Sequence, residues 1–269
     1  MIGDVVDLLQ CPHCAGPLLL SGGTVGCDTG HRFDVARQGQ LNLLGKAAGA
    51  TADTAEMVGA RAAFLAGGHY QPIAELVARS AMGSVLVEPG AGTGYYLNAV
   101  VAAANTPDAR GLATDLSAYA CRRAAKLPDI GAVVADTWAG LPIRDQVAST
   151  VLTVFAPRNA AEFARICARS GRVLVITPLP EHLTEVRQAS GLLTIEPDKQ
   201  DRLLADTHTS LIHLGHQDLR YEVTLSAADL THLIEMGPNA FHPSRRDAHA
   251  MRHISRTTVA VRLDVFQPR

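Results

Sequence analysis

Apolar positions change their spacing along the chain, and these changes predict where helices and strands lie. Residues 18–25 form a short apolar run that Gly22-Gly23 interrupts, which is typical of a hairpin. Two segments with helical spacing follow, 53–66 and 72–81. From residue 84, short buried runs alternate with helical segments. The expected strands are 84–88, 111–115, 132–136, 149–155 and 172–177, with helices at 95–104, 117–126 and 159–169. This alternation predicts an α/β fold with a parallel, doubly wound sheet.

The C-terminal part has a different pattern, with alternating segments at 219–225 and 257–266 around a helix at 226–236. Such alternation indicates antiparallel strands that close the sheet. We therefore expect three parts, namely a small domain over 1–44, a linker with a helical segment over 45–82, and the α/β domain over 83–269.

Composition narrows the class of protein. The chain has 269 residues, of which 47% are hydrophobic and 19% charged. No apolar run reaches the roughly 18 residues that span a membrane, and the first residues carry two acids and no base, unlike a secretory signal. We expect a cytoplasmic protein with no membrane partner. A formal net charge of −2 argues against a strongly basic, DNA-binding protein.

Three of the five cysteines lie in the first 27 residues, in a pattern typical of a zinc ribbon. Cys11 and Cys14 are separated by two residues, and Cys27 and His31 by three. Two such knuckles supply the four ligands of a tetrahedral Zn²⁺ site, which would let so short a segment fold. A closed site of this kind favours a structural or recognition role over catalysis. His13 is an alternative ligand to His31, whereas Cys121 and Cys167 fall on apolar stretches and are expected in the core.

A glycine-rich turn joins the first strand of the α/β domain to its helix. Its glycines are Gly90, Gly92 and Gly94, with Thr93 between the last two. Glycines allow the backbone to approach a nucleotide-type ligand closely, but this loop fits NAD as well as S-adenosylmethionine. Acids stand at three strand ends, namely Glu88, Asp115 and Asp136. That three-acid pattern resembles class I (Rossmann-like) S-adenosylmethionine-dependent methyltransferases. The resemblance implies that the second acid binds the ribose and that the third lies near the adenine amine.

The whole chain resembles the zinc-ribbon 23S rRNA (guanine-N1)-methyltransferases, a family that includes macrolide-resistance enzymes. The resemblance rests on the ribbon and the glycine loop, on Phe33-Asp-Val-Ala-Arg-Gln-Gly-Gln-Leu-Asn-Leu-Leu44, Asp53-Thr-Ala-Glu-Met-Val-Gly-Ala-Arg61, Phe64-Leu-Ala-Gly-Gly-His-Tyr70-Gln-Pro72, Phe155-Ala-Pro157 and Thr177-Pro-Leu-Pro-Glu-His182-Leu183. It implies that Tyr70, Gly92, Thr93 and His182 contact the cofactor. It also implies a homodimer that methylates guanine N1 in a 23S rRNA hairpin loop.

Departures from the family pattern leave the substrate open. The segment after the ribbon is usually basic in this family, but here Lys46 is the only charge before Asp53. Because basic residues supply most non-specific RNA affinity, a small-molecule substrate is the alternative. A binding module without catalysis is a third reading, against which the intact glycine loop argues. Arg122, Arg123 and Lys126 share one predicted helix and form a candidate RNA-facing surface.

Candidates for the remaining roles are less distinct. Removing the proton of guanine N1 calls for a base or for a donor to the carbonyl oxygen. Arg158 and Asn159 are candidate donors and Glu181 is a candidate base, but the pattern assigns no catalytic residue. The aromatic residues near predicted loops are Tyr95, Tyr96, Trp138, Phe155 and Phe241. A last cluster comprises His208, His213 and His216. Their spacings of five and three do not place them on one strand face, so no second metal site is expected.

Overall fold

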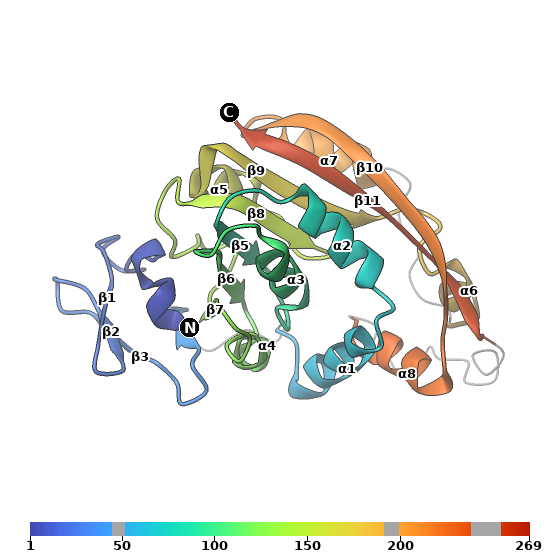
Figure 1. The fold of residues 1–269 in the computed structure, drawn as a ribbon, viewed down its shortest axis with the longest axis horizontal. Coiled ribbons are helices and arrows are strands. Elements are labelled where there is room, and N and C mark those ends of the chain that lie inside the picture. Colours follow the sequence, from blue (N-terminus) through green and yellow to red (C-terminus); the bar gives the residue numbers. More distant parts are fainter. Residues whose placement is uncertain (45–51, 191–198, 238–253) are drawn as a thin grey trace.

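A twisted eight-stranded sheet forms the centre of the molecule (Figure 1). The computed structural model describes residues 1–44, 52–190, 199–237 and 254–269. The strand order is β10-β11-β9-β8-β5-β6-β7-β4. The strands are β4 (Leu41–Asn42), β5 (Val85–Pro89), β6 (Arg110–Asp115), β7 (Ile130–Val134), β8 (Ala148–Val154), β9 (Cys167–Pro178), β10 (Leu211–Thr224) and β11 (Arg256–Pro268). The pairs from β4 to β9 are parallel, whereas β11 and β10 add to β9 as antiparallel strands. The predicted doubly wound α/β fold is confirmed.

Helices cover both faces of the sheet. The first core includes residues of α1 (Ala55–Ala66), α2 (Gln71–Ser80), α3 (Tyr95–Ala103), α4 (Ala118–Ala124) and α8 (Ala227–Glu235). The second core, on the opposite face, includes residues of α5 (Ala160–Ile166) and α7 (Lys199–Thr207). A further helix, α6 (Thr184–Ser190), follows β9. Cys121 and Cys167 are buried, one in each core, as predicted.

The N-terminal segment is a small antiparallel sheet docked against the main one. It contains two short 3₁₀ helices, η1 (Ile2–Asp4) and η2 (Val6–Leu8), then β1 (Leu19–Ser21), β2 (Thr24–Gly26) and β3 (Arg32–Asp34). The predicted hairpin with its Gly22-Gly23 turn is therefore confirmed. In Figure 1 this part lies at one end of the molecule, beside β7.

Several contacts attach the N-terminal segment to the sheet. The Arg110 guanidinium donates to both carboxylate oxygens of Asp7, at 2.7 and 2.8 Å. The backbone of Gln10 donates to Pro142 at 3.0 Å, and that of Arg144 donates to Leu8 at 2.9 Å. Strand β4 then pairs in parallel with β7. The predicted boundary at residue 44 thus follows a strand that belongs to the main sheet, and residues 45–51 lie outside the described residues.

Most predicted elements are present, with shifted ends. Strand β7 ends at Val134, so Asp136 lies in the loop beyond it, and α5 ends at Ile166 because β9 begins at Cys167. The sequence reading missed β4, α6 and α7, and it missed that β10 begins at Leu211. In the described part of the chain, the helices are too short or too polar to cross a membrane.

Candidate functional site

The carboxyl ends of the parallel strands bring the predicted cofactor residues to one edge of the sheet. Glu88 is the fourth residue of β5, Asp115 ends β6, and Asp136 follows β7. Strand β5 lies between β6 and β8. The chain continues from β5 to β6 and β7 on one side, and then crosses back to β8 and β9 on the other side. Ligands of doubly wound sheets bind outside such a switch point. The edge therefore has the architecture of a nucleotide-type site.

The glycine loop passes too close to its neighbours to carry side chains. Gly90 has φ +72°, and a Cβ there would lie 2.6 Å from the Cβ of Ala156 in the loop after β8. Gly94 precedes α3 with φ +78°, and a Cβ there would lie 2.8 Å from Leu127. Both positions require glycine because of the left-handed backbone and the close approach. The loop consequently packs closely against the segment that follows β8.

Two of the predicted acids accept hydrogen bonds from the backbone, and of these Glu88 is buried and Asp115 is partly buried. One oxygen of Asp115 accepts from the N–H of Gly92 and the other from Ser117, both at 2.8 Å. Glu88 accepts from the N–H of Leu97 at 3.0 Å and so caps the first turn of α3. Burial raises the pKa of both carboxyls, that of Glu88 well above its usual range. Asp115 thus holds the glycine loop directly, and Glu88 holds the first turn of the helix that follows the loop.

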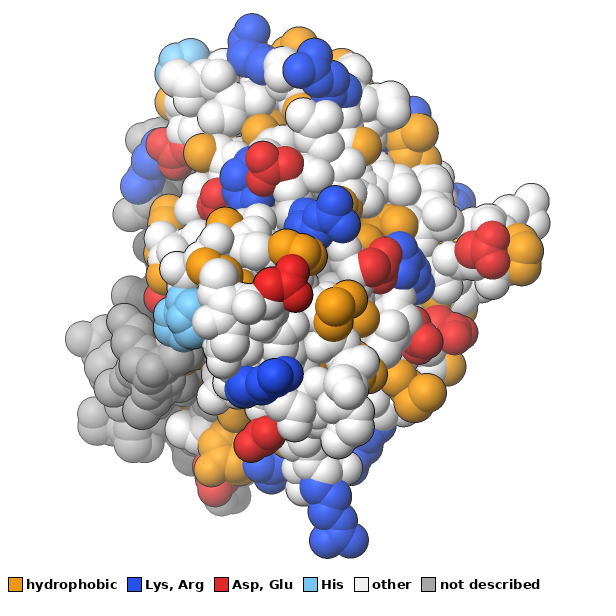
Figure 2. Space-filling view, turned by 90° about the vertical axis from the view of Figure 1, so that its left-hand side faces the viewer, with side chains coloured by type: hydrophobic (Ala, Val, Ile, Leu, Met, Phe, Trp, Pro, Cys, Tyr) orange, Lys and Arg blue, Asp and Glu red, His pale blue; other side chains and the backbone are white. Residues whose placement is uncertain are grey.

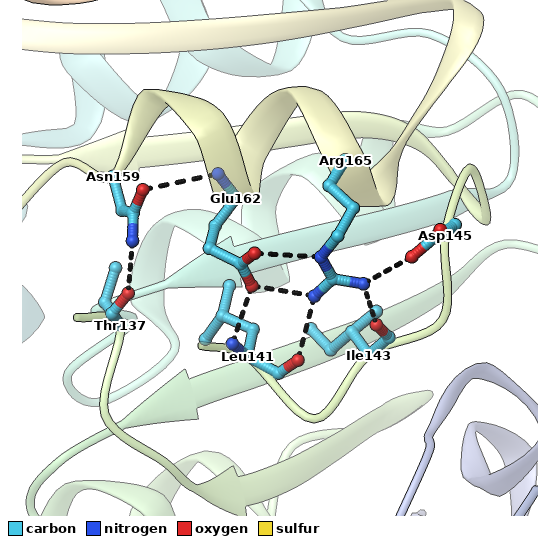
Figure 3. A network of polar contacts seen from close by, with 7 residues as sticks. All are labelled: Thr137, Leu141, Ile143, Asp145, Asn159, Glu162 and Arg165. Carbon is cyan, nitrogen blue, oxygen red and sulfur yellow. Dashed lines mark hydrogen bonds and ion pairs between the residues drawn. The ribbon is translucent and has the colours of Figure 1, made fainter. Parts of the chain in front are cut away.

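Asp136 lies in a loop that α5 holds in place. Its side chain accepts from the N–H of Trp138 at 2.9 Å, forming a local turn. Figure 3 shows how the loop from Thr137 to Asp145 is tied to α5. Arg165 donates to the carbonyls of Leu141 and Ile143, and it pairs with Glu162 and Asp145. Because this network fixes the backbone, Asp136 keeps its place beside the end of β6.

Tyr70 and His182 meet in a buried aromatic cluster, although they lie 112 positions apart. The Tyr70 hydroxyl is 3.3 Å from Nε2 of His182, and both side chains are buried. Nδ1 of His182 accepts from the N–H of Ala260 at 3.3 Å, so in the neutral ring Nε2 carries the proton and donates to Tyr70. The backbone of Phe155 has φ +54°. The centroid of its ring lies 5.4 Å from that of the His182 ring. The Tyr70 hydroxyl therefore keeps its own proton for another acceptor.

Arg61 is a site residue that sequence reasoning missed in this role. Its guanidinium pairs with Asp53 and donates to the carbonyl of Met236 at 2.7 Å. Nη1 of Arg61 would lie 3.3 Å from a Cβ at Gly92, so the cation covers the glycine loop. Arg61 belongs to the family motif from Asp53 to Arg61, but its spacing in the sequence does not predict that its side chain points toward the glycine loop.

The three candidates for proton removal or carbonyl binding have different surroundings from those expected. Asn159 caps α5 through the N–H of Glu162 at 3.3 Å, and its amide donates to Thr137 at 3.0 Å (Figure 3). Both ends of this amide thus have structural partners. Arg158 lies near Asp206 and Asp264, which oppose the lowering of its pKa by burial. Glu181 is exposed, directly before His182.

Among the aromatic candidates for base stacking, two are exposed in loops at this edge. Trp138 is 66% exposed and Phe155 is 39% exposed, whereas Tyr96 is buried. Tyr95 is partly buried against the first core. Phe241 lies outside the described residues.

The four predicted zinc ligands converge in the ribbon. The ligand atoms of Cys11, Cys14, Cys27 and His31 all lie within 4.8 Å of one another. The sulfurs of Cys14 and Cys27 are 3.7 Å apart, and Nδ1 of His31 lies 3.3 and 3.5 Å from the sulfurs of Cys27 and Cys11. A tetrahedral ion with Zn–S bonds of about 2.3 Å separates its sulfurs by about 3.7 Å. The cluster therefore has the dimensions of a tetrahedral zinc site.

Neighbouring side chains support these ligands. The Thr29 hydroxyl is 3.0 Å from the sulfur of Cys27, and this hydrogen bond lowers the pKa of the thiol to about 5. The same hydroxyl is 3.1 Å from both Cys14 and His31. The ring of His13 lies tilted beside that of His31 with centroids 4.8 Å apart, and His13 is not part of the four-ligand group. The preference for His31 over His13 thus agrees with the geometry.

Known proteins share both halves of this arrangement. Residues 9–46 match the family model described as the zinc ribbon of the RlmA N-terminal region. Over 278 residues, and 98% of each chain, the protein is 41% identical to a 23S rRNA (guanine(748)-N(1))-methyltransferase of Streptomyces fradiae. The chain belongs to the 23S rRNA (guanine-N1)-methyltransferase family. This methyltransferase is also 38% identical to a Micromonospora griseorubida protein named "Putative 23S rRNA (guanine-N(1)-)-methyltransferase", over 98% of this chain and 99% of that one.

Solved structures agree on the fold of this methyltransferase. One is a chain of the "Complex between the Haloferax volcanii Trm112 methyltransferase activator and the putative methyltransferase". It matches with a TM-score of 0.50 and 17% identity, over 79% of this chain and 97% of that chain. At this identity the likeness concerns the class I methyltransferase fold alone.

Proposed function

We propose that this enzyme uses S-adenosylmethionine to methylate N1 of a guanine in a hairpin loop of 23S rRNA, in the cytoplasm. The observation that carries the proposal is the complete strand-end site in a chain whose whole length resembles rRNA guanine-N1 methyltransferases. S-adenosylmethionine supplies an activated methyl group, so the protein's part is to position the guanine and to exclude water. The proposal extends to macrolide resistance, which expression in a sensitive strain would test.

Each residue of the strand-end site is assigned to one part of the cofactor. We assign the ribose to Asp115, the adenine amine to Asp136, and the methionine part to the loop of Gly90, Gly92, Thr93 and Gly94. Tyr70 and His182 would lie at the methionine end, where the Tyr70 hydroxyl could donate to the carboxylate. Glu88 acts through the helix that follows the loop, since its carboxyl oxygen accepts from the N–H of Leu97.

Arg61 adds a cation to that cleft. Its guanidinium lies over Gly92, and the cofactor's methionine part ends in a carboxylate that a guanidinium binds well. We therefore assign this carboxylate to Arg61.

In the ribbon, we assign Zn²⁺ to Cys11, Cys14, Cys27 and His31. The set has four protein ligands and no open position, so the ion would hold the fold of the ribbon. The proposed domains remain those expected from the sequence, with 1–44 recognising substrate, 45–82 linking, and 83–269 binding the cofactor.

A basic hollow beside the glycine loop is the proposed contact with RNA phosphates. It has a volume of about 480 Å³ and is lined by Thr93, Tyr119, Arg122, Arg123 and Lys126, among others. Arg122 lies over the ring of Tyr119, 5.5 Å from its centroid, while Arg123 and Lys126 are exposed. Cations so close to the cofactor loop would hold the backbone of a nucleotide that enters the cleft.

The salt dependence of RNA binding tests this surface. Replacing Arg123 and Lys126 by Ala removes two phosphate contacts, so the slope of log K against log salt should become shallower by about 1.4 to 1.8. Arg79→Ala removes an exposed cation on α2, outside the hollow, and should leave the slope unchanged. Equal slopes for all three proteins would contradict the assignment.

A small-molecule substrate is the second candidate, and the charge distribution favours it. The net charge is −2, and on the face in Figure 2 basic and acidic side chains are interspersed, without a large basic field. Turnover of a small molecule would depend little on salt, whereas RNA methylation would weaken steeply.

The deciding experiment incubates the protein with labelled S-adenosylmethionine and rRNA from a strain that lacks this methylation. Primer extension should then stop at one guanine of a large-subunit hairpin loop, because a methyl group on N1 blocks base pairing. An Asp115→Ala variant should give no stop. Absence of label in RNA, from protein that binds the cofactor, would reject the rRNA substrate and favour a metabolite.

The proposal includes a homodimer, which the family resemblance implies. Sedimentation velocity at several protein concentrations would measure it. A monomer that still methylates RNA would overturn this part alone.

A further inference from the structure

Two histidines and an aspartate converge on the outer strands of the sheet, far from the ribbon in sequence. His213 and His216 belong to β10 and Asp264 to β11, which run side by side (Figure 1). The ligand atoms of all three lie within 4.8 Å of one another. Nε2 of His213 is 2.9 Å from one carboxylate oxygen of Asp264, and the two imidazole rings are nearly parallel, 6.3 Å apart. This grouping is compact enough to hold one ion.

A β-bulge makes the grouping possible. Residues three apart on a regular strand point to opposite faces, which is why the sequence predicted no metal site here. In the structure, His213 pairs with Phe266, Gly215 with Val265, and His216 with Asp264, so Leu214 is an extra residue. The extra residue restores both histidines to the face that carries Asp264. The prediction that these histidines do not share a face is therefore wrong.

The carboxylate has unused capacity in a buried place. The side chain of Asp264 is 5% exposed, and its second oxygen is buried without a hydrogen-bond partner among the described residues. Such an oxygen costs free energy unless something binds it. His213 is 29% exposed and His216 is exposed, so an ion could enter from solvent on that side.

Neighbouring charges leave the group accessible to a cation. Arg262, on the same strand, is occupied by Asp218 through bonds of 2.6 and 3.1 Å. Arg158 faces both Asp264 and Asp206, so part of its charge is balanced by a second acid. Among the described residues, the two imidazoles are the other titratable groups that act on this carboxyl.

We propose that His213, His216 and Asp264 form a second metal site, which takes a divalent transition metal such as Zn²⁺, Ni²⁺ or Co²⁺. Two imidazoles and one carboxylate suit these ions, whereas Mg²⁺ and Ca²⁺ prefer oxygen ligands alone. Three protein ligands leave positions for water, in contrast to the closed set in the ribbon. The ion would clasp β10 to β11 across the bulge.

Metal stoichiometry tests the site on the full chain. Protein with one equivalent of zinc in the ribbon is titrated with Zn²⁺ by calorimetry, then desalted and analysed for metal. The wild type should retain two zinc ions per chain. His216→Ala, a change of an exposed side chain, and Asp264→Asn should retain one. His208→Ala is the matched control, since this nearby histidine is outside the group, and it should retain two.

Two readouts separate the sites and guard against misfolding. Protection of the ribbon thiols from a thiol-reactive dye reports zinc in the ribbon, and cofactor affinity reports the fold of each variant. With Co²⁺ at the second site, absorption should lack the charge-transfer band of thiolate ligands. A wild type that retains one zinc ion, or a folded His216→Ala variant that still retains two, would overturn the proposal.

Discussion

The proposed cofactor role of Tyr70 rests on its hydroxyl. His182 donates to it, so its own proton is available to a ligand. In Tyr70→Phe the ring stays and this donor is lost, which should weaken S-adenosylmethionine binding about fivefold to tenfold, the value of one buried hydrogen bond. Isothermal titration calorimetry measures the affinity.

A second tyrosine provides the control for that change. Tyr221 donates to the carbonyl of His69 at 2.9 Å, so Tyr221→Phe also removes a hydrogen bond of a partly buried hydroxyl. Both variants should lose a similar free energy of unfolding, but only Tyr70→Phe should lose cofactor affinity. Equal loss of affinity in both would mean that Tyr70 acts through stability alone.

Individual site residues were predictable where their backbone position decides their role. Gly90, Asp115 and the ribbon ligands follow strand ends and knuckles, which sequence spacing locates. His182 differs, because only the family resemblance pointed to it. Its burial comes from β11, whose Ala260 supplies a hydrogen bond from 78 positions away. Such a contact has no local signature.

At the scale of elements, the first turn of α3 is capped by the buried carboxyl of Glu88. Burial raises the pKa of Glu88 well above its usual value of 4.5, so the folded state holds a proton that the unfolded state loses. The stabilising effect of this proton is complete below about pH 4.5 and is lost as pH rises through the folded pKa.

Glu88→Gln removes that titration and keeps an oxygen for the N–H of Leu97. The variant should therefore gain stability relative to wild type as pH rises from 5 to 8. Urea denaturation at several pH values measures the difference. A constant difference across this range would show that Glu88 does not titrate between the two states.

Asn159 tests whether α5 serves as a support or supplies a catalytic group. Asn159→Ala removes the cap of α5 and should cost about 1 kcal/mol of stability. Asn159→Asp keeps the cap but loses the hydrogen bond to the Thr137 carbonyl, so it should restore part of the stability and of the turnover. If Asn159 instead held the guanine oxygen, the Asp variant would fold normally and still fail to turn over, because a carboxylate donates no hydrogen bond.

Elements were predictable where apolar periodicity is long. The strands from β5 to β9 are buried runs, and their alternation with helices determined the fold class. Strand β4 has two residues, too few for any period, and it exists because β7 offers a free edge. The bulge at Leu214 was equally invisible, since an extra residue leaves the spacing in sequence unchanged and alters only the pairing.

For the whole molecule, the ribbon and the cofactor cleft should respond separately to loss of metal. A chelator should unfold β1 to β3, which have little core of their own, and abolish RNA methylation. Cofactor affinity should change by less than about threefold, because the strand-end site belongs to the other core. Calorimetry and methyl transfer, with and without chelator, measure both. A parallel loss of cofactor binding would contradict this separation.

The attachment of the ribbon to β7 has a consequence for how a target is selected. Asp7 is bonded to Arg110, and β4 pairs with the strand that leads to Asp136. The ribbon and the carboxyl edge of the sheet are therefore joined by direct contacts. An RNA bound at the ribbon would present to the strand-end site a base at a fixed distance from the ribbon. A hairpin lengthened by one base pair would offer the wrong nucleotide, whatever its sequence.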